Sequence, residues 1–265
     1  METKTVIDVA ITSLSCEEQI NTMVKWGESN LSKVVCIANV HMLIEAHQNP
    51  FFGAVLQNAD LVTPDGMPLV WMLRFLGVGH QDRVAGIDVL EGVCKLAQET
   101  GVGVYFLGSQ DTILEKMKRR LNREFPNLKI CGMTSLPFRQ LTDEEDRTLV
   151  YTLNQSGAGL IFVSLGCPKQ ETWMSQHKGQ VSAVMVGLGG AFPVYAGIHK
   201  RAPKVVREAG LEWFYRLIQE PRRLWKRYAT TMPVFVWLLS KQLFWGIFLN
   251  YSPTNIANHA SQSDE

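Results

Sequence analysis

The chain has 265 residues, of which 46% are hydrophobic and 19% are charged, a globular composition with enough length for one large domain plus an appendage or for two small domains. The formal net charge of only +1 says little about partners. Five scattered cysteines without a C-x-x-C pair argue against a disulfide framework and a zinc site, and they fit a reducing, cytosolic setting. The N-terminus, METKTVIDVA, lacks the long apolar run of a secretory signal.

Short apolar runs typical of β-strands alternate with helical patterns along most of the chain. The strand patterns cover residues 4–12, 33–39, 59–63, 102–108, 128–134, 159–166 and 182–190. The helical patterns cover residues 16–29, 40–48, 67–77, 86–100, 111–124 and 143–155. Two of these helices open on a capping box, Ser15 with Glu18 and Thr142 with Glu145. Continuous apolar strands separated by helices predict an α/β fold, with a mostly parallel sheet and helices on both faces.

The pattern changes near Ala202-Pro203, where helices rich in Trp, Tyr, Leu and Arg begin. We predict three parts: a core over residues 1–202, a basic and aromatic helical appendage over 203–250, and a disordered polar tail over 251–265. Residues 199–241 carry ten Lys or Arg against three acids, a net charge of +7, whereas residues 1–198 carry a net charge of −4. This asymmetry indicates a C-terminal segment that meets an anionic surface or ligand.

The stretch EWFYRLIQEPRRLWKRY (212–228) allows three interpretations. In the first, its apolar face packs on the core and its basic face is solvated. In the second, it lies on an anionic bilayer, with Trp213, Trp225 and Tyr228 at the interface. In the third, the stretch binds nucleic acid. Its fraction of apolar residues is high for that role, so we expect no nucleic-acid partner. The following run, 232–249, is interrupted by polar residues and is a poor transmembrane span, so we favour peripheral binding to a membrane surface.

Ligands of parallel sheets bind outside the carboxyl ends of the strands, so the loops after the strands are the candidate site. Asp65 follows a strand, in the tripeptide Pro64-Asp65-Gly66. That tripeptide is typical of a β-turn. At this edge of the sheet, its carboxylate is also a candidate general base toward an acceptor hydroxyl. His41 also allows two interpretations. It is either a ligand contact or a histidine whose hydrogen bonds are satisfied at a helix start, and we favour the second.

Two further loops offer donors for an anion. In GCPKQE (166–171), a helix start and Gln170 are candidate donors to a phosphate or sugar oxygen, and the alternative is a simple strand-to-helix turn. In VGLGGAF (186–192), Gly189 and Gly190 allow a phosphate or ribose to approach the main chain. The chain has no Walker A motif and no dinucleotide fingerprint. It also has no D-x-D to hold a metal-bound diphosphate, so we predict no metal site.

In their order and spacing, these segments resemble the WecG/TagA/CpsF family of bacterial glycosyltransferases, glycosyltransferase family 26. The resemblance covers roughly residues 5–230 and rests on ANVHML, NADLVTPDGMPLVW, DRVAGID, GCPKQE, GGAFPVYAG, KRAPK and GLEWFYRLIQEPRRLWKRY. It implies a Rossmann-like core with a C-terminal membrane-targeting appendage. It also implies an inverting, metal-independent transfer of a sugar from a UDP donor to an undecaprenyl-diphosphate-linked saccharide. The setting implied is the biosynthesis of cell-surface polysaccharides, on the cytoplasmic face of the bacterial plasma membrane.

The resemblance also implies roles for individual residues. Asp65 corresponds to the proposed general base, and Arg83 and Gln170 correspond to residues placed at the active site. Asn39 corresponds to the loop of the first core strand. The appendage cations expected to close over the diphosphate are Arg216, Arg223 and Lys226.

Two positions depart from the family pattern. Ile37 stands where many members have threonine, and Pro193 follows Phe192 where many have aspartate. Both departures leave the donor open between an N-acetylmannosamine type and a glucose type. The acceptor, the linkage and the oligomeric state, including a homo-oligomer, are open as well.

Two other function classes compete with a glycosyltransferase. An oxidoreductase or epimerase on a Rossmann-like sheet needs a dinucleotide fingerprint and an acid about twenty residues further on, which this chain lacks. The second is a Rossmann-like nucleotide-binding module that associates with membrane or RNA through its basic C-terminus. Thermal protection by UDP, with no effect of NAD, distinguishes the glycosyltransferase from the first of these.

Overall fold

The computed structural model describes residues 1–137 and 139–249, except for the side chains of residues 223 and 245–249. The predicted tail, 251–265, and the predicted site side chain of Arg223 therefore lie outside the described residues.

A six-stranded parallel sheet forms the centre of the protein, in the order β4-β3-β8-β7-β5-β6. Its strands are β3 (Lys33–Ala38), β4 (Leu61–Pro64), β5 (Val104–Gly108), β6 (Ile130–Thr134), β7 (Leu160–Ser164) and β8 (Val184–Gly187). The predicted α/β, Rossmann-like sheet is thereby confirmed. Because the strands are parallel, the loops that follow them meet at one edge.

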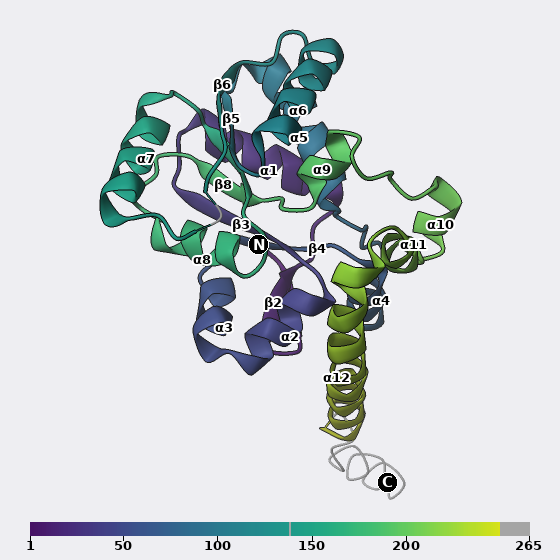
Figure 1. The fold of residues 1–265 in the computed structure, drawn as a ribbon. Coiled ribbons are helices and arrows are strands. Elements are labelled where there is room, and N and C mark those ends of the chain that lie inside the picture. The colour runs from purple at the N-terminus through teal and green to yellow at the C-terminus, as the bar shows by residue number, and fades with distance from the viewer. Residues whose placement is uncertain (138, 250–265) are drawn as a thin grey trace, which may run out of the picture.

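Helices cover both faces of this sheet (Figure 1). Successive side chains of a strand point to opposite faces, so each face carries apolar side chains that need to be covered. On β7, Ile161 and Val163 belong to one core, and Leu160 and Phe162 belong to the other. The first core is closed by α2 (Val40–Gln48), α3 (Pro50–Gln57), α4 (Met67–Phe75), α7 (Asp143–Gln155) and α8 (Lys169–Gln176). The second core is closed by α1 (Cys16–Glu28), α5 (Gly86–Thr100), α6 (Asp111–Glu124) and α9 (Ala191–Tyr195).

The segment 4–12, predicted as one strand, is instead a hairpin. Its strands β1 (Thr3–Val6) and β2 (Val9–Thr12) pair antiparallel. The turn residues Ile7 and Asp8 have φ of 44° and 64°, as in a tight hairpin turn. The prediction was wrong because the alternation of apolar residues continues through the turn, and no glycine or asparagine marks it.

The predicted helix starts are confirmed at both capping boxes. Ser15 accepts a hydrogen bond from the N–H of Glu18, whose carboxylate accepts one from the N–H of Ser15, and the same pair of bonds opens α7. Helix α3 was not predicted. A new helix begins there because Asn49 caps it. Pro50 fits its first position because the N–H that proline lacks would have no partner within the helix.

The appendage comprises α10 (Lys204–Glu208), α11 (Glu212–Gln219) and α12 (Pro221–Leu249). The stretch 212–228 is thus two helices separated at Glu220. Helix α12 packs against α2 and runs past the N-terminal hairpin (Figure 1). There the N–H of Ile7 donates to Gln242 Oε1 at 3.0 Å, and Gln242 Nε2 donates to the carbonyl of Thr5 at 2.8 Å. Over residues 1–137 and 139–249, the structure has no helix with the length and apolar character needed to cross a membrane.

Candidate active site

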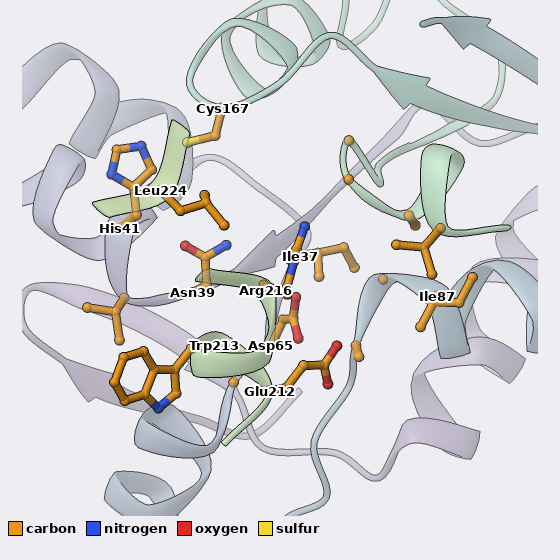
Figure 2. Close-up of a pocket in the computed structure, with 18 of the residues that line it drawn as sticks. Ile37, Asn39, His41, Asp65, Ile87, Cys167, Glu212, Trp213, Arg216 and Leu224 are labelled. Atoms are coloured by element: carbon orange, nitrogen blue, oxygen red, sulfur yellow. The ribbon is translucent and has the colours of Figure 1, made fainter. Parts of the chain in front are cut away.

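A pocket of about 250 Å³ lies between the carboxyl edge of the sheet and the helices α11 and α12 (Figure 2). Its walls include the loops after β3, β4, β7 and β8, the four loops that the sequence indicated. The predicted site residues that line it are Asn39, Asp65, Arg83, Gln170, Gly189, Gly190 and Arg216. Residues that are far apart in the sequence therefore meet at one place.

A main-chain hydrogen bond holds Asp65 at the carboxyl end of β4. Its N–H donates to the carbonyl of Ala38 at the end of β3, at 2.7 Å. The next residue, Gly66, has φ of 123° and caps α4, a conformation that favours glycine. The tripeptide is therefore a direct link from the end of β4 to the cap of α4 and not a β-turn, and Asp65 lines the pocket within this link.

Burial raises the pKa of Asp65 to about 6, against the positive charges of Arg83 and Arg216, which lower it. The carboxylates of Glu212 and Asp88 act in the same direction as burial. A carboxylate with a pKa near 6 is ionised at neutral pH and is more basic than an exposed aspartate. This is the tuning expected of a general base.

The guanidinium of Arg83 is sheltered in the wall of the pocket. Its Nη1 donates to Oε2 of Glu212, on α11, and its Nη2 lies 3.9 Å from Asp88 Oδ2, on α5. The hydrogen bond and charge of Glu212 raise the pKa of Arg83 against the effect of burial. A fixed cation therefore stands beside the Asp65 carboxylate.

Arg216 brings a second cation of the appendage to the glycine loop after β8. A Cβ added at Gly190 would lie 2.8 Å from Arg216 Nη2, so the guanidinium lies directly against that backbone. The cation also lowers the pKa of Asp65, which places its charge within range of that carboxylate. The sequence motifs predicted the meeting of these two segments.

Gln170 is buried, and both of its polar atoms bind within the protein. Its Nε2 donates to Glu171 Oε1 at 2.7 Å, and its Oε1 accepts from the N–H of Gly166 at 3.2 Å. A Cβ at Gly187 would lie 2.9 Å from Gln170 Nε2, and one at Gly189 would lie 3.0 Å from its Oε1. Gln170 thus supports the loops after β7 and β8 and also lines the pocket, so donation to a ligand stays a prediction.

The end of β3, the residue after it and the first turn of α2 supply three lining residues of different character. Asn39 Oδ1 accepts from the N–H of Met42 at 3.3 Å and so caps α2. His41 was expected to be satisfied at the helix start, but its Nδ1 is buried without a hydrogen-bond partner among the described residues. Burial, assisted by the charge of Arg227, lowers the pKa of His41 to about 4. Ile37, noted above as a departure from the family pattern, gives this part of the pocket wall an apolar side chain.

Pro193, the other departure, is accommodated in the first turn of α9. A proline there loses no helical hydrogen bond, because the first N–H groups of a helix have no partner within it. Its carbonyl accepts from the N–H groups of Ile198 and His199, at 2.9 and 3.2 Å. These bonds turn the chain into the segment that carries Lys200 and Arg201 to the pocket.

One predicted appendage residue does not reach the pocket. The α12 residues that line the cavity are Leu224, Arg227, Tyr228, Thr231 and Met232, at helical spacing on one face. Lys226 lies off this face and is exposed. The motifs quoted from the sequence contained Arg227 and also Glu212, but sequence reasoning missed both because it did not fix the rotation of the helices.

Within the described ranges, no group of three or more His, Cys, Asp or Glu side chains is arranged to hold a metal ion. The model of the Glycosyl transferase WecG/TagA/CpsF family matches residues 4–247.

Similar proteins include enzymes named N-acetylglucosaminyldiphosphoundecaprenol N-acetyl-beta-D-mannosaminyltransferase. The one from Bacillus spizizenii is 32% identical over 210 residues, 79% of each chain. The one from Bacillus subtilis is 30% identical over 230 residues, 86% of this chain and 87% of the relative. The one from Staphylococcus aureus MW2 is 28% identical over 233 residues, 87% and 88% of the two chains. With its fold, its pocket and a family match over most of its length, this chain belongs to the WecG/TagA/CpsF family of glycosyltransferases.

Proposed function

We propose that the protein transfers a sugar from a UDP donor to a polyprenyl-diphosphate-linked saccharide, with inversion and without a metal ion. The observation that carries the proposal is the pairing of a basic carboxylate with fixed cations in one pocket, Asp65 beside Arg83 and Arg216. The names of the relatives favour an N-acetylmannosamine donor and an N-acetylglucosamine-bearing lipid diphosphate. A glucose-type donor remains the alternative, because Ile37 removes a hydroxyl from the pocket wall.

The reaction is a single displacement. Asp65 accepts the proton of the acceptor hydroxyl while the hydroxyl oxygen forms a bond to the anomeric carbon. The bond from that carbon to the UDP phosphate oxygen breaks, and UDP leaves with the electron pair. Arg83, Arg216 and the bare backbone at Gly190 balance the charge that develops on the leaving diphosphate.

Membrane association at the inner face of the plasma membrane is part of the same proposal. Exposed apolar side chains gather on α4 and α11, namely Trp71, Phe75, Phe214 and Ile218. The Trp71 ring, on α4, lies 2.9 Å from the place of a Cβ at Gly210, in the link that leads into α11. The pocket is lined by Gly210 and Trp213 of the same segment, which suits a substrate that arrives from a bilayer. Exposed cations of the appendage, Lys204, Arg222 and Lys226, complement anionic headgroups.

A donor panel tests the proposal. UDP-N-acetylmannosamine, UDP-N-acetylglucosamine and UDP-glucose are each incubated with the protein and a synthetic polyprenyl-diphosphate N-acetylglucosamine, with and without a chelator. Mass spectrometry should show one added sugar for one preferred donor, a product insensitive to chelator, and none with the Asp65→Asn variant. No product with any donor, together with no thermal protection by UDP, would contradict the proposal.

A further inference from the structure

Glu212 is a charged residue of the pocket that the mechanism above does not use. It is the first residue of α11, and its carboxylate accepts a hydrogen bond from Arg83 Nη1. The side chains of Glu212 and Arg83 are only 23% and 12% exposed. Removing one partner of such a sheltered ion pair leaves the other charge poorly solvated, unlike the loss of a surface pair. The contact is therefore a strong constraint on both groups.

The position of Glu212 at a helix start has a simpler explanation, since the helix dipole favours a carboxylate there. That explanation does not account for its partner. Arg83 lies 129 residues earlier, in the loop between α4 and α5. Glu212 therefore connects the appendage to a loop of the core at the wall of the pocket, where Figure 2 shows its side chain next to that of Asp65.

The charges that face Asp65 come from three elements. Arg83 lies in the loop after α4, and Asp88 lies on α5. Glu212 and Arg216 both lie on α11. The two arginines favour the ionised carboxylate, and the two acids oppose it. Arg83 is also within 3.9 Å of Asp88. The pair between Glu212 and Arg83 therefore governs how strongly the Arg83 charge acts on Asp65.

We propose that Glu212 is a positioning residue: its carboxylate holds the Arg83 guanidinium at the pocket wall and holds α11 over the pocket. The inference rests on the proposed function, in which Asp65 is the base and Arg83 faces the leaving UDP. Departure of α11 removes the partner of Arg83 and changes the charge beside Asp65. The ion pair between Glu212 and Arg83 thus links the position of α11 over the pocket to the charge beside Asp65.

The first test is the pH dependence of kcat/KM for Glu212→Gln in the full-length protein, with the donor and acceptor found above. Since a negative charge that raises the pKa of Asp65 is removed, the acidic limb should move to lower pH. The value of kcat should fall about tenfold because Arg83 is no longer fixed. Glu212→Asp should restore part of the loss. The matched control is Glu208→Gln, an exposed appendage glutamate paired with Lys204, which should behave like wild type. An unchanged kcat in Glu212→Gln would overturn the positioning role whatever the acidic limb does, because the limb alone reports only the lost charge.

A second test needs no activity and separates this inference from the proposed function. Hydrogen exchange of the α11 amides in the ligand-free protein should accelerate about tenfold in Glu212→Gln and in Arg83→Gln, and not in Glu208→Gln. If wild type transfers no sugar from any donor, the proposed function fails, and the exchange rates still decide whether the pair holds α11. Unchanged exchange in Glu212→Gln shows that the pair does not hold the helix, and the inference is then wrong.

Discussion

The guanidinium of Arg216 lies against the backbone of Gly190, with Nη2 only 2.8 Å from the place that a Cβ would take. Gly190 has φ of −66°, which any residue adopts, so its importance does not lie in backbone freedom. It lies in the room that the missing side chain leaves for the appendage. The glycine loop of the core and the cation of α11 therefore lie together in the pocket wall, where we propose that they bind the diphosphate.

Substituting Gly190 by alanine should displace the Arg216 guanidinium without straining the backbone. We expect the affinity for UDP to fall about tenfold, as for the loss of one charged hydrogen bond, with little change in thermal stability. Calorimetric titration with UDP measures the effect. Gly79→Ala is the matched control, because nothing lies within 4 Å of the added methyl group and the residue has no positive φ. Unchanged UDP affinity in Gly190→Ala would remove Arg216 from the binding surface.

Asp65→Asn should lower kcat at least about a hundredfold, the usual contribution of a general base, and should leave UDP binding intact. In the wild type, a base with a pKa of about 6 makes kcat/KM fall about tenfold per unit as the pH drops below 6. The residual activity of the variant should lose this acidic limb. Near-normal turnover of Asp65→Asn would show that another group takes the proton.

The same raised pKa has a consequence for folding. The Asp65 pKa in the fold, about 6, lies above its value of 3.8 in the unfolded chain, so the unfolded chain loses its proton first as the pH rises. Wild type should therefore lose up to about 3 kcal/mol of stability between about pH 4 and 6. Asp65→Asn should melt higher than wild type at pH 8, and the difference should disappear near pH 4. The exposed Asp111→Asn is the control, and equal melting of Asp65→Asn and wild type at both pH values would contradict the burial of this charge.

The sequence predicts those features of the structure that depend on residues close together in the chain. The strand β7 and the capped start of α7 follow from local periodicity and capping, and both are confirmed. The pocket follows from the rule that loops of parallel strands meet at one edge. The hairpin turn at Ile7-Asp8 has no local marker. Nor does any local pattern fix the rotation of α12, which brings Arg227 to the pocket and leaves Lys226 outside.

The sequence did not predict the ion pair of Glu212 or the hydrogen bonds of Gln170, because no local pattern marks them. Each depends on tertiary contacts, across 129 residues for Glu212 and Arg83, and beneath the glycine loop for Gln170. A motif indicates that a residue belongs to the site. Only the packing shows whether its polar atoms face the cavity or support the neighbouring loops.

The exposed apolar surface of α4 and α11 predicts specific losses of membrane binding. Phe75→Ser and Ile218→Ser, which change no charge, should each weaken binding to phosphatidylglycerol-containing vesicles about tenfold. Transfer to a water-soluble acceptor analogue should persist in both. Tyr151→Ser is the control, since this exposed aromatic lies on α7, at the opposite end of the molecule from α11 in Figure 1. Vesicle binding that survives both changes would place the membrane contact elsewhere.

Point substitutions are the appropriate test because the appendage cannot be removed cleanly. Leu224 and Phe235 of α12 are buried, and Phe235 belongs to the core on one face of the sheet. A deletion from residue 203 onward would expose that core. Loss of activity in a deleted protein would therefore not separate membrane docking from unfolding.

Gln170 allows the two roles of a buried amide to be separated. Its Nε2 donates to Glu171 Oε1, and this bond lowers the pKa of Glu171 against the larger effect of burial. Gln170→Ala would leave the Glu171 carboxylate without that donor, at a cost of about 2–3 kcal/mol in the free energy of unfolding. Replacing both residues, as in Gln170→Ala with Glu171→Met, should recover part of this loss, because no unpaired charge remains buried.

Denaturant unfolding of the two single variants and the double variant measures this coupling, and UDP titration of the same proteins adds the second readout. A loop-supporting Gln170 predicts a large loss of stability in Gln170→Ala and a smaller loss in the double variant. A Gln170 that serves as a ligand donor predicts unchanged stability and a loss of UDP affinity that the second substitution does not alter. The hydrogen bond to Gly166 and the close packing under Gly189 favour the first result, since both contacts exist without any ligand.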